Sequence, residues 1–443
     1  MKNILLVLFA LFLVSACEND QAVVSENAVS LSLSKEAKFK SVPPQTVLDY
    51  NTQYVLPFEL LTTTSEGVEI RNGGYGSATT AHPTKAGEFY ALTDRGPNVD
   101  YADGKKFPVA DYTPRIGHFA ITKEGSVVLL NETLFKDPFG NTISGLPNPV
   151  GKGATGEIPY DINNNVLPYD DYGLDSEGLV ALKDGSFWVS DEYGPHIVNY
   201  SAEGIELERI SPYGINDGNG GRKLPKVFAK RRANRGMEGL AVTPNEKTLV
   251  GIMQSTMFNP SGGAATNRTV TRIVTFDLET GITKQYLYKQ EANNLSNSEI
   301  VALSDKQFLV VERDGKYSGD GVVQKYIYKI DLEGATDVSG SNVEAELGML
   351  INGKTLEGSS WDEITNAGIQ PVKKELVADL AALTGYPHDK LEGLWLINHN
   401  TLGCINDDDF AVIDNDGNGV LDQKILPGTG GSIDSSSLYM IHF

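Results

Sequence analysis

The chain has 443 residues and a formal net charge of −21, because 58 acidic side chains outnumber 37 basic ones. Such an acidic protein repels the phosphates of nucleic acid, so no nucleic-acid partner is expected, whereas cation binding is compatible with this charge. The two cysteines are too few for a disulfide framework or a cysteine metal cluster.

The first residues have the composition of a secretory signal. Lys2 is followed by an apolar run over 4–14, which is too short to span a membrane, and then by Ser15, Ala16 and Cys17. The small residues before Cys17 resemble the lipobox of bacterial lipoproteins, which implies cleavage before Cys17 and acylation of its thiol. An ordinary signal peptide with a chance cysteine is the alternative.

These features predict a signal peptide over residues 1–16, a lipid-anchored polar tether over 17–48 and a folded domain over 49–443. The protein is then exported and held at the cell envelope, on the outer membrane or the cell surface if the host has two membranes. The lipid on Cys17 is its only expected contact with a membrane.

One pattern recurs along the rest of the chain. A short apolar strand, a turn rich in Asp, Gly, Pro or Asn, and a second apolar strand form each unit, and a third strand follows in most of them. The apolar runs are nearly continuous, as expected for strands buried on both faces. Five such units begin near Gly76, Asp175, Gly236, Ser298 and Leu391.

Repeated units of this kind predict an all-β fold, a β-propeller with five blades. A sixth unit could lie within 95–174 or 332–389. The chain ends on a third strand over 438–443, and 54–61 has the pattern of a strand without a unit of its own. We therefore expect the N-terminal strand to complete the last blade and close the ring.

Acidic residues recur at corresponding places in these units. In a propeller the first strand lines the central channel, and the end of the second strand returns to the same rim. We predict that four glutamates at the start of the first strand are catalytic: Glu177, Glu238, Glu299 and Glu392. Four further carboxylates are expected to join them at one mouth of the channel: Asp94, Asp191, Glu312 and Asp407.

Carboxylates that converge in this way raise each other's pKa and resist joint ionisation. Ca²⁺ takes about six to eight oxygen ligands, so these eight side chains are predicted to bind it. The lack of cysteine ligands and the scatter of only six histidines argue against zinc or copper. The alternative is that the repeated glutamates only bond neighbouring backbone groups.

A basic segment over 222–235 interrupts the acidic chain and runs directly into the third unit. Arginine forks match the oxygens of phosphate or carboxylate, so we predict that arginines near the mouth bind an anionic substrate. The residues assigned to this role are Arg95, Arg232, Arg235 and Arg313. A solvated loop, in which Arg235 pairs with the glutamates, is the alternative.

A segment near the C-terminus is similar to the start of an EF-hand calcium loop, with oxygen ligands at alternating positions and a glycine at the turn. It predicts a structural calcium site at Asp414, Asp416, Asn418, Val420 and Asp422. Ile425 stands where the terminal acidic ligand would be, and a plain Asn/Asp/Gly-rich loop is the alternative.

Several stretches together resemble the phytase-like family named for esterase-like activity of phytase. The resemblance implies the propeller fold and action on phosphate esters through the recurrent acidic residues. Lys390 departs from it, because the family usually has asparagine there. The matching stretches are 92–98, 175–180, 187–192, 232–240, 298–303, 310–314, 391–394 and 407–410.

We therefore predict a calcium-dependent phosphoesterase that acts outside the cytoplasm on a small anionic phosphate ester, a phosphomonoester or a phosphodiester. The bound metal would neutralise phosphate oxygens and lower the pKa of a water molecule. A calcium-dependent lactonase or carboxyl esterase, and a non-catalytic calcium-binding surface module, remain as alternatives. Nothing in the sequence indicates the oligomeric state.

Overall fold

The computed structural model describes residues 53–214 and 222–442. The chain divides into two compact units, 1–36 and 37–443, and every described residue belongs to the second. The predicted signal peptide, Cys17 and the tether as far as residue 48 lie outside the described residues. Within the described ranges, no helix is long and apolar enough to cross a membrane.

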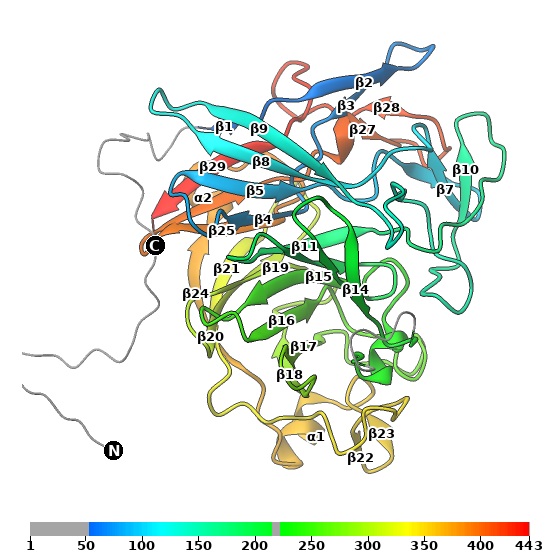
Figure 1. Cartoon of the computed structure of the whole chain (residues 1–443). Coiled ribbons are helices and arrows are strands. Elements are labelled where there is room, and N and C mark those ends of the chain that lie inside the picture. The colour runs from blue at the N-terminus through cyan, green and yellow to red at the C-terminus, as the bar shows by residue number, and fades with distance from the viewer. Residues whose placement is uncertain (1–52, 215–221, 443) are drawn as a thin grey trace, which may run out of the picture. The chain divides into compact units, whose positions relative to one another are not determined.

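The fold is all-β, and its main elements are five four-stranded antiparallel sheets (Figure 1). Four sheets use strands in chain order, and the fifth takes its last strand from the N-terminal side of the chain. Their strand orders are β4 (Ala78–Ala81), β5 (Glu88–Leu92), β8 (Arg115–Ile121), β9 (Val127–Leu134); β11 (Ser176–Ala181), β12 (Phe187–Asp191), β13 (Ile197–Tyr200), β14 (Glu206–Ile210); β15 (Met237–Val242), β16 (Thr248–Met253), β17 (Val270–Asp277), β18 (Thr283–Lys289); β19 (Ser296–Ala302), β20 (Gln307–Arg313), β21 (Lys325–Asp331), β24 (Lys373–Asp379); and β25 (Gly393–Asn398), β26 (Thr401–Ile405), β29 (Ser437–His442), β1 (Tyr54–Val55).

We call β4, β11, β15, β19 and β25 the inner strands, because each begins its sheet and contacts the inner strands of the neighbouring sheets. The contacts run in chain order, and β25 in turn contacts β4. In the last sheet β1 pairs antiparallel with β29, with Tyr54 opposite Leu438. Strands from the two ends of the described chain therefore share one sheet.

Smaller elements fill the connections. The stretches 95–174 and 332–389, both fully described, contain no four-stranded sheet of their own. The remaining elements are β2 (Glu59–Thr63) with β3 (Glu69–Asn72), β6 (Val99–Tyr101) with β7 (Gly104–Phe107) and β10 (Ile158–Asp161), β22 (Leu350–Ile351) with β23 (Lys354–Thr355), β27 (Val412–Ile413) with β28 (Asp422–Gln423), the helices α1 (Trp361–Asn366) and α2 (Leu380–Thr384), and 3₁₀ turns at Lys226–Lys230 and Asp409–Ala411.

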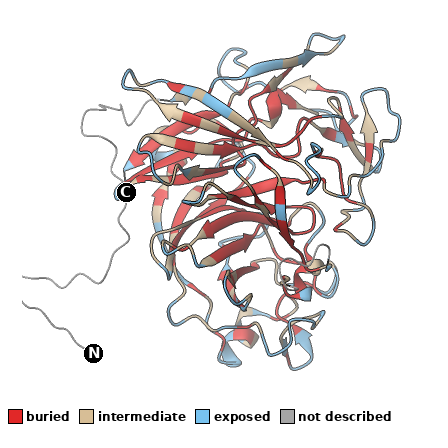
Figure 2. Cartoon of the chain, in the orientation of Figure 1, coloured by how far each residue is buried: buried red, intermediate tan, exposed pale blue. Residues whose placement is uncertain are grey.

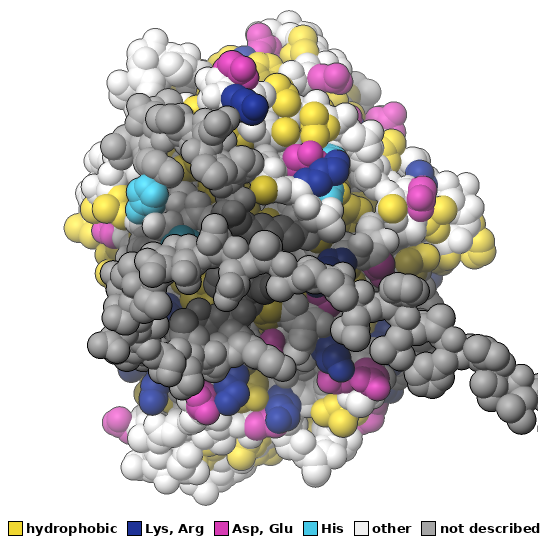
Figure 3. Space-filling model, turned by 60° about the vertical axis from the view of Figure 1, so that its left-hand side comes forward, with side chains coloured by type: hydrophobic (Ala, Val, Ile, Leu, Met, Phe, Trp, Pro, Cys, Tyr) yellow, Lys and Arg dark blue, Asp and Glu magenta, His cyan; other side chains and the backbone are white. Residues whose placement is uncertain are grey.

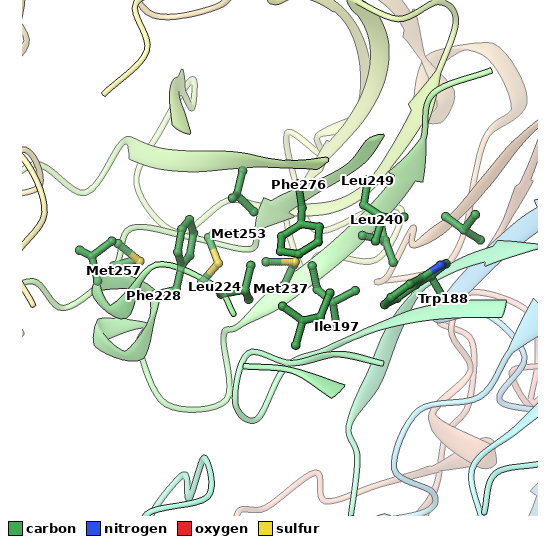
Figure 4. Close-up of a cluster of buried hydrophobic side chains, with 14 residues drawn as sticks. Trp188, Ile197, Leu224, Phe228, Met237, Leu240, Leu249, Met253, Met257 and Phe276 are labelled. Atoms are coloured by element: carbon green, nitrogen blue, oxygen red, sulfur yellow. The ribbon is translucent and has the colours of Figure 1, made fainter. Parts of the chain in front are cut away.

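The core lies between neighbouring sheets, and the strands carry most of the buried residues while the loops are exposed (Figure 2). One large cluster packs the sheet that begins with β11 against the sheet that begins with β15 (Figure 4). Trp188, Phe228 and Phe276 belong to it, and burying each such side chain stabilises the fold by roughly 1.5–3 kcal/mol. On the face drawn in Figure 3, acidic and basic side chains are interspersed with apolar ones.

Two bulges in the inner strands position the residues that matter for function. Pairing of β11 with β12 skips from Ser176 to Gly178, and pairing of β15 with β16 skips from Met237 to Gly239. Glu177 and Glu238 are therefore the extra residues, and a bulge re-aims its side chain out of the regular alternation.

The glycine after each bulge permits the next inner strand to approach closely. A Cβ at Gly178 would lie 2.7 Å from the backbone nitrogen of Leu240, and one at Gly239 would lie 2.6 Å from that of Ile300. The repeated Glu-Gly pair thus combines a re-aimed carboxylate with a contact between sheets that only glycine allows.

Candidate functional site

A polar cavity of about 360 Å³ opens where the inner strands begin. Side chains of both signs line it, which distinguishes it from an ordinary acidic surface patch. The acidic lining residues are Asp94, Asp100, Asp175, Glu177, Glu192, Glu238, Glu392, Asp409 and Asp414, and the basic ones are Arg95, Lys105, Arg235, Arg313 and Lys390.

The strand registers show which residues of the five sheets are equivalent. Equivalent pairs of the first and second strands are Ala78 with Leu92, Gly178 with Ser190, Gly239 with Ile252, Glu299 with Val311 and Gly393 with Ile405. The residue before each first-strand member forms the first-strand set: Ser77, Glu177, Glu238, Ser298 and Glu392. The residue two positions after each second-strand member forms the second-strand set: Asp94, Glu192, Gln254, Arg313 and Asp407.

The predicted equivalence of Glu299 with Glu177 is therefore wrong by one position. In β19 the pairing skips from Asn297 to Glu299, so Ser298 is the bulged residue. The Glu299 carboxylate instead accepts hydrogen bonds from the backbone N–H groups of Leu240, at 3.3 Å, and Ile300, at 2.9 Å. Glu299 joins neighbouring strands and does not line the polar cavity.

Asp191 and Glu312 also lie away from the cavity, because side chains alternate along a strand and these residues precede the second-strand set by one position. Asp191 accepts the N–H groups of Asp175, at 3.0 Å, and Gly194, at 2.6 Å. Glu312 accepts the Tyr288 hydroxyl at 2.5 Å and the Lys374 ammonium at 3.0 Å. Both carboxylates therefore bond to other groups of the fold.

Three carboxylates inside the cavity lie close together. Oxygen atoms of Asp94, Asp175 and Glu177 all lie within 4.8 Å of one another, and all three residues are buried. Asp94 accepts the Gly96 N–H at 2.8 Å, while Oδ2 of Asp175 accepts no hydrogen bond from the described residues and lies 3.4 Å from the Arg95 guanidinium. Sequence reasoning missed Asp175, although it directly precedes the Ser-Glu-Gly of its unit.

Glu192 and Glu238 stand beside these three and share one neutral donor. The amide Nε2 of Gln254 donates to Oε1 of Glu192 at 2.9 Å and also contacts Oε1 of Glu238. Oε2 of Glu238 is buried and has no hydrogen-bond partner. An unsatisfied buried carboxylate oxygen of this kind is expensive unless a ligand or a proton occupies it.

Burial and mutual repulsion raise the pKa of four of these carboxyl groups, Asp94, Glu177, Glu192 and Glu238. For Glu177 burial is the main cause, followed by the charges of Glu238 and Asp175. Burial, followed by the charge of Glu392, raises the pKa of Glu238 to about 8. Burial also raises the pKa of Asp94 and Glu192. The protein environment therefore favours the protonated form of these carboxyl groups.

The three arginines of the cavity differ in what they already bind. Arg95 lies 3.4 Å from both Asp175 and Glu157, and Arg313 pairs with Glu392. Arg235 is different, because its hydrogen bonds among the described residues go only to neutral oxygens. They reach Oε1 of Gln254 at 2.8 Å and Oγ of Ser296 at 3.4 Å.

The fourth predicted arginine, Arg232, is exposed and absent from the lining of the polar cavity. Its guanidinium stacks over the ring of Phe258 at 5.6 Å. Burial and the nearby charges of Arg235 and Arg268 lower its pKa. The prediction that Arg232 contributes to the site is therefore not supported by its position.

Lys390 is a cavity residue that was noted only as a departure from the family pattern. Its ammonium group donates to Oδ2 of Asp407 at 2.7 Å and to Oδ1 of Asp409 at 2.6 Å. Asp407, predicted as a metal ligand, is thus already neutralised by a built-in cation. The last sheet therefore contributes an ammonium group to the cavity, whereas the second sheet contributes carboxylates.

The predicted calcium loop near the C-terminus uses its oxygens on its own backbone. Asp414 accepts the N–H groups of Asn418, at 3.1 Å, and Gly419, at 2.8 Å. Asn418 accepts the N–H of Val420 at 2.9 Å, and Asp422 accepts that of Asn415 at 3.1 Å. These bonds are those of an Asx-rich turn, and calcium binding there stays a prediction.

Comparison with known proteins identifies a family. Residues 70–410 match the model of the family described as phytase-like, esterase-like activity of phytase, which confirms the resemblance seen in the sequence. An uncharacterized secreted protein of Arthroderma benhamiae is 27% identical over 297 residues, 56% of each chain. The chain thus spans about half the length of this curated relative.

Solved structures resemble the chain only distantly. The PQQ-bound aldose sugar dehydrogenase of Streptomyces coelicolor has 10% identity and a TM-score of 0.29, with 91% of this chain and 99% of that one covered. A streptogramin B lyase has 11% identity and a TM-score of 0.32, with 89% and 99% covered. Scores this low carry no inference about the present chain.

Proposed function

We propose that this chain, which belongs to the phytase-like family (esterase-like activity of phytase), is a calcium-dependent phosphoesterase that acts outside the cytoplasm. Family membership supports an esterase-like hydrolase. The finer assignment rests on one observation, that buried carboxylates with unsatisfied oxygens share a cavity with an arginine that pairs with no carboxylate among the described residues.

The carboxylate side of the cavity fits a hard divalent cation. Asp94, Asp175 and Glu177 supply oxygens at close range, and Glu192 and Glu238 lie next to them. Oxygen-only ligands suit Ca²⁺, and burial and neighbouring carboxylates raise the pKa of Asp94 and Glu177. When bound, Ca²⁺ would neutralise phosphate oxygens and lower the pKa of a coordinated water.

The arginine side fits the anionic group of the substrate. Gln254 and Ser296 offer Arg235 only neutral acceptors, so its positive charge remains available to bind an anion. Gln254 also contacts Glu192 and Glu238, so it joins the anion-binding side to the carboxylate side. A phosphate ester held by Arg235 would present its oxygens to the carboxylate-bound cation.

Glu238 is suited to move a proton. Its pKa of about 8 favours the protonated form at neutral pH, and its Oε2 has no hydrogen-bond partner in the described part of the chain. We assign Glu238 as the general acid that protonates the leaving oxygen, a role that requires a pKa near the working pH. Glu392 is held by Arg313 and serves instead to orient that guanidinium.

The proposal also covers the cellular location and the architecture of the protein. We propose that the five four-stranded sheets are the blades of a propeller closed through β1, with the polar cavity at one mouth of its central channel. Export agrees with the secreted relative, and anchoring through acylated Cys17 is proposed from the sequence alone. Membrane extraction and mass spectrometry of the N-terminal peptide test the lipid directly.

One assay tests the reaction. Purified mature protein is offered phosphomonoester, phosphodiester, phytate, lactone and carboxyl-ester substrates, with Ca²⁺ or with chelator. We expect hydrolysis of a phosphate ester that stops on chelation and returns with Ca²⁺. Turnover of lactones or carboxyl esters alone would replace the proposal with a lactonase or esterase, and calcium binding without any turnover would indicate a non-catalytic module.

A further inference from the structure

Two of the six histidines meet a glutamate at the other end of the inner strands, beside a second cavity. Candidate ligand atoms of His82, Glu88 and His118 all lie within 4.8 Å of one another, and the three residues are half-buried. None of these three residues belongs to the polar cavity.

Strand pairing brings the three residues together. Glu88 and Tyr90 are two positions apart in β5, so they share a face, and Tyr90 lies directly opposite His118 of β8. His82 follows β4 in the hairpin to β5, where its N–H donates to the Glu88 carbonyl at 3.0 Å. The cluster therefore stands on the frame of one sheet.

Contacts among the side chains hold the imidazoles in place. Nε2 of His118 lies 2.6 Å from Oε2 of Glu88. The ring of Tyr90 packs on both imidazoles, with centroids 4.7 Å from His118 and 5.2 Å from His82, and the two imidazole centroids are 5.2 Å apart. Because this packing already holds the imidazoles in place, a metal would have to order them less when it binds.

We propose that His82, Glu88 and His118 form a second metal site, for a transition-metal dication such as Zn²⁺. Two imidazoles and one carboxylate are a ligand set that zinc takes in sites that keep a fourth position open. Nitrogen ligands disfavour Ca²⁺, so this site and the polar cavity would select different metals. The expectation that scattered histidines argue against zinc overlooked this pair.

The second cavity gives the site access. Its volume is about 430 Å³, and His82 and Glu88 stand among its lining residues. The remaining lining is mainly apolar and includes Leu179, Leu240 and Trp395. An open metal position here would meet a solvent-connected and largely apolar space.

Metal binding has to displace existing contacts of His82 and Glu88. Nδ1 of His82 accepts the N–H groups of Thr84, at 3.1 Å, and Lys85, at 3.2 Å, and the Lys85 ammonium lies 3.1 Å from Glu88. Thr84 and Lys85 are exposed, so water can take over their N–H groups when the His82 ring turns. Lys85 is then a competitor for the Glu88 carboxylate, and its removal should favour the metal.

Calorimetric titration of the mature protein with ZnCl₂, in saturating Ca²⁺ to occupy the polar cavity, tests the proposal. Titration with Co²⁺, followed by visible absorption, reports the coordination independently of turnover. The variants are His82→Ala, His118→Ala and Lys85→Ala. His399→Ala is the matched control, because His399 is exposed in the turn between β25 and β26.

We expect one equivalent of Zn²⁺, weakened more than about tenfold in each ligand variant. We expect binding to tighten about two- to fivefold in Lys85→Ala, the size of an exposed ion pair, and to stay unchanged in His399→Ala and Glu177→Gln. Tightening in Lys85→Ala cannot arise from misfolding. Absence of zinc binding in the wild type, or affinity that stays at the wild-type value in His82→Ala and His118→Ala, would overturn the proposal.

Discussion

The two ends of the inner strands differ sharply, although the same strands form both. Where the strands begin, bulged glutamates and their neighbours line a polar cavity of about 360 Å³. A few residues later, Leu179, Leu240 and Ile300 line an apolar cavity of about 430 Å³. Burial of apolar side chains stabilises a fold, whereas burial of like charges opposes it.

This difference shows which end of the inner strands lowers the folding stability of the protein. Regular alternation beyond the bulges is enough to keep the apolar end packed. At the polar end the bulge turns a carboxylate towards others of the same charge, and hydrogen bonds leave oxygens of Asp175 and Glu238 unsatisfied. Such an arrangement is costly unless a cation binds, so the polar end is the place to test for one.

The largest effect is expected from Glu177→Gln. Loss of one charged oxygen ligand should weaken Ca²⁺ binding and lower kcat/KM more than about 100-fold, because ligands matter more than the residues that support them. Without Ca²⁺ the variant should be at least as stable as the wild type, since repulsion with Glu238 and Asp175 is relieved. Calorimetry, ester hydrolysis and thermal melting measure the three quantities.

A matched control for this variant is Asp184→Asn, which changes a carboxylate in the hairpin turn of the same sheet. Asp184 is exposed and bonds only to Ser186 among the described residues. The Asp184→Asn variant should bind Ca²⁺ with the wild-type affinity. Equal losses in Asp184→Asn and Glu177→Gln would mean that total charge, and not the cavity, controls binding.

The apolar end should respond to truncation in stability and not in chemistry. Leu240 is buried in the cluster of Figure 4 and also lines the apolar cavity. Leu240→Ala should cost about 2–4 kcal/mol of unfolding free energy, as large-to-small core substitutions do. Denaturant unfolding gives this value, and kcat of the folded protein should be unchanged. A fall in kcat would show that the two ends are coupled.

Arg235→Ala separates substrate binding from metal binding. Hydrogen bonds to charged groups contribute about 1.5–3 kcal/mol, so KM for a phosphate ester should rise about 10- to 100-fold while Ca²⁺ affinity does not fall. Arg232→Ala should change little, because Arg232 is exposed and lies off the cavity. Steady-state kinetics on both variants decides which arginine holds the anion.

The smallest expected effect is a pH dependence of stability. The pKa of Glu238 is raised in the folded state, so folding favours its protonated form. Stability of the calcium-free protein should therefore fall as pH rises between the ordinary glutamate pKa and about 8. Thermal melting in chelator measures this slope. Glu238→Gln should flatten it, and a slope that persists unchanged would assign it to other groups.

Much of the fold could be predicted from the sequence, because apolar strands alternate with turn residues in a fixed order. The same order places β1 with the last sheet, since the final unit lacks a strand. Turn residues and apolar runs depend on short stretches of sequence. Strands and hairpins can therefore be predicted from them without knowing which distant residues come into contact.

The site could be predicted less well, because register is not local. Glu299 occupies the expected place in the sequence pattern, but β19 bulges at Ser298 and carries Glu299 to the neighbouring strand. Asp191 was chosen although Glu192, one residue later, faces the cavity. A shift of one residue reverses the face of a strand, and no composition signal reports it.

Calcium titration with proton counting tests the central claim most directly. Calorimetry near pH 7, in buffers of different ionisation enthalpy, measures the protons released for each Ca²⁺ bound. The proposed ligands Asp94 and Glu177 have raised pKa values and must lose protons to bind the metal, so we expect release of about one proton or more per Ca²⁺, reduced in Glu177→Gln. Absence of calcium binding, or binding without proton release in either protein, would contradict the account.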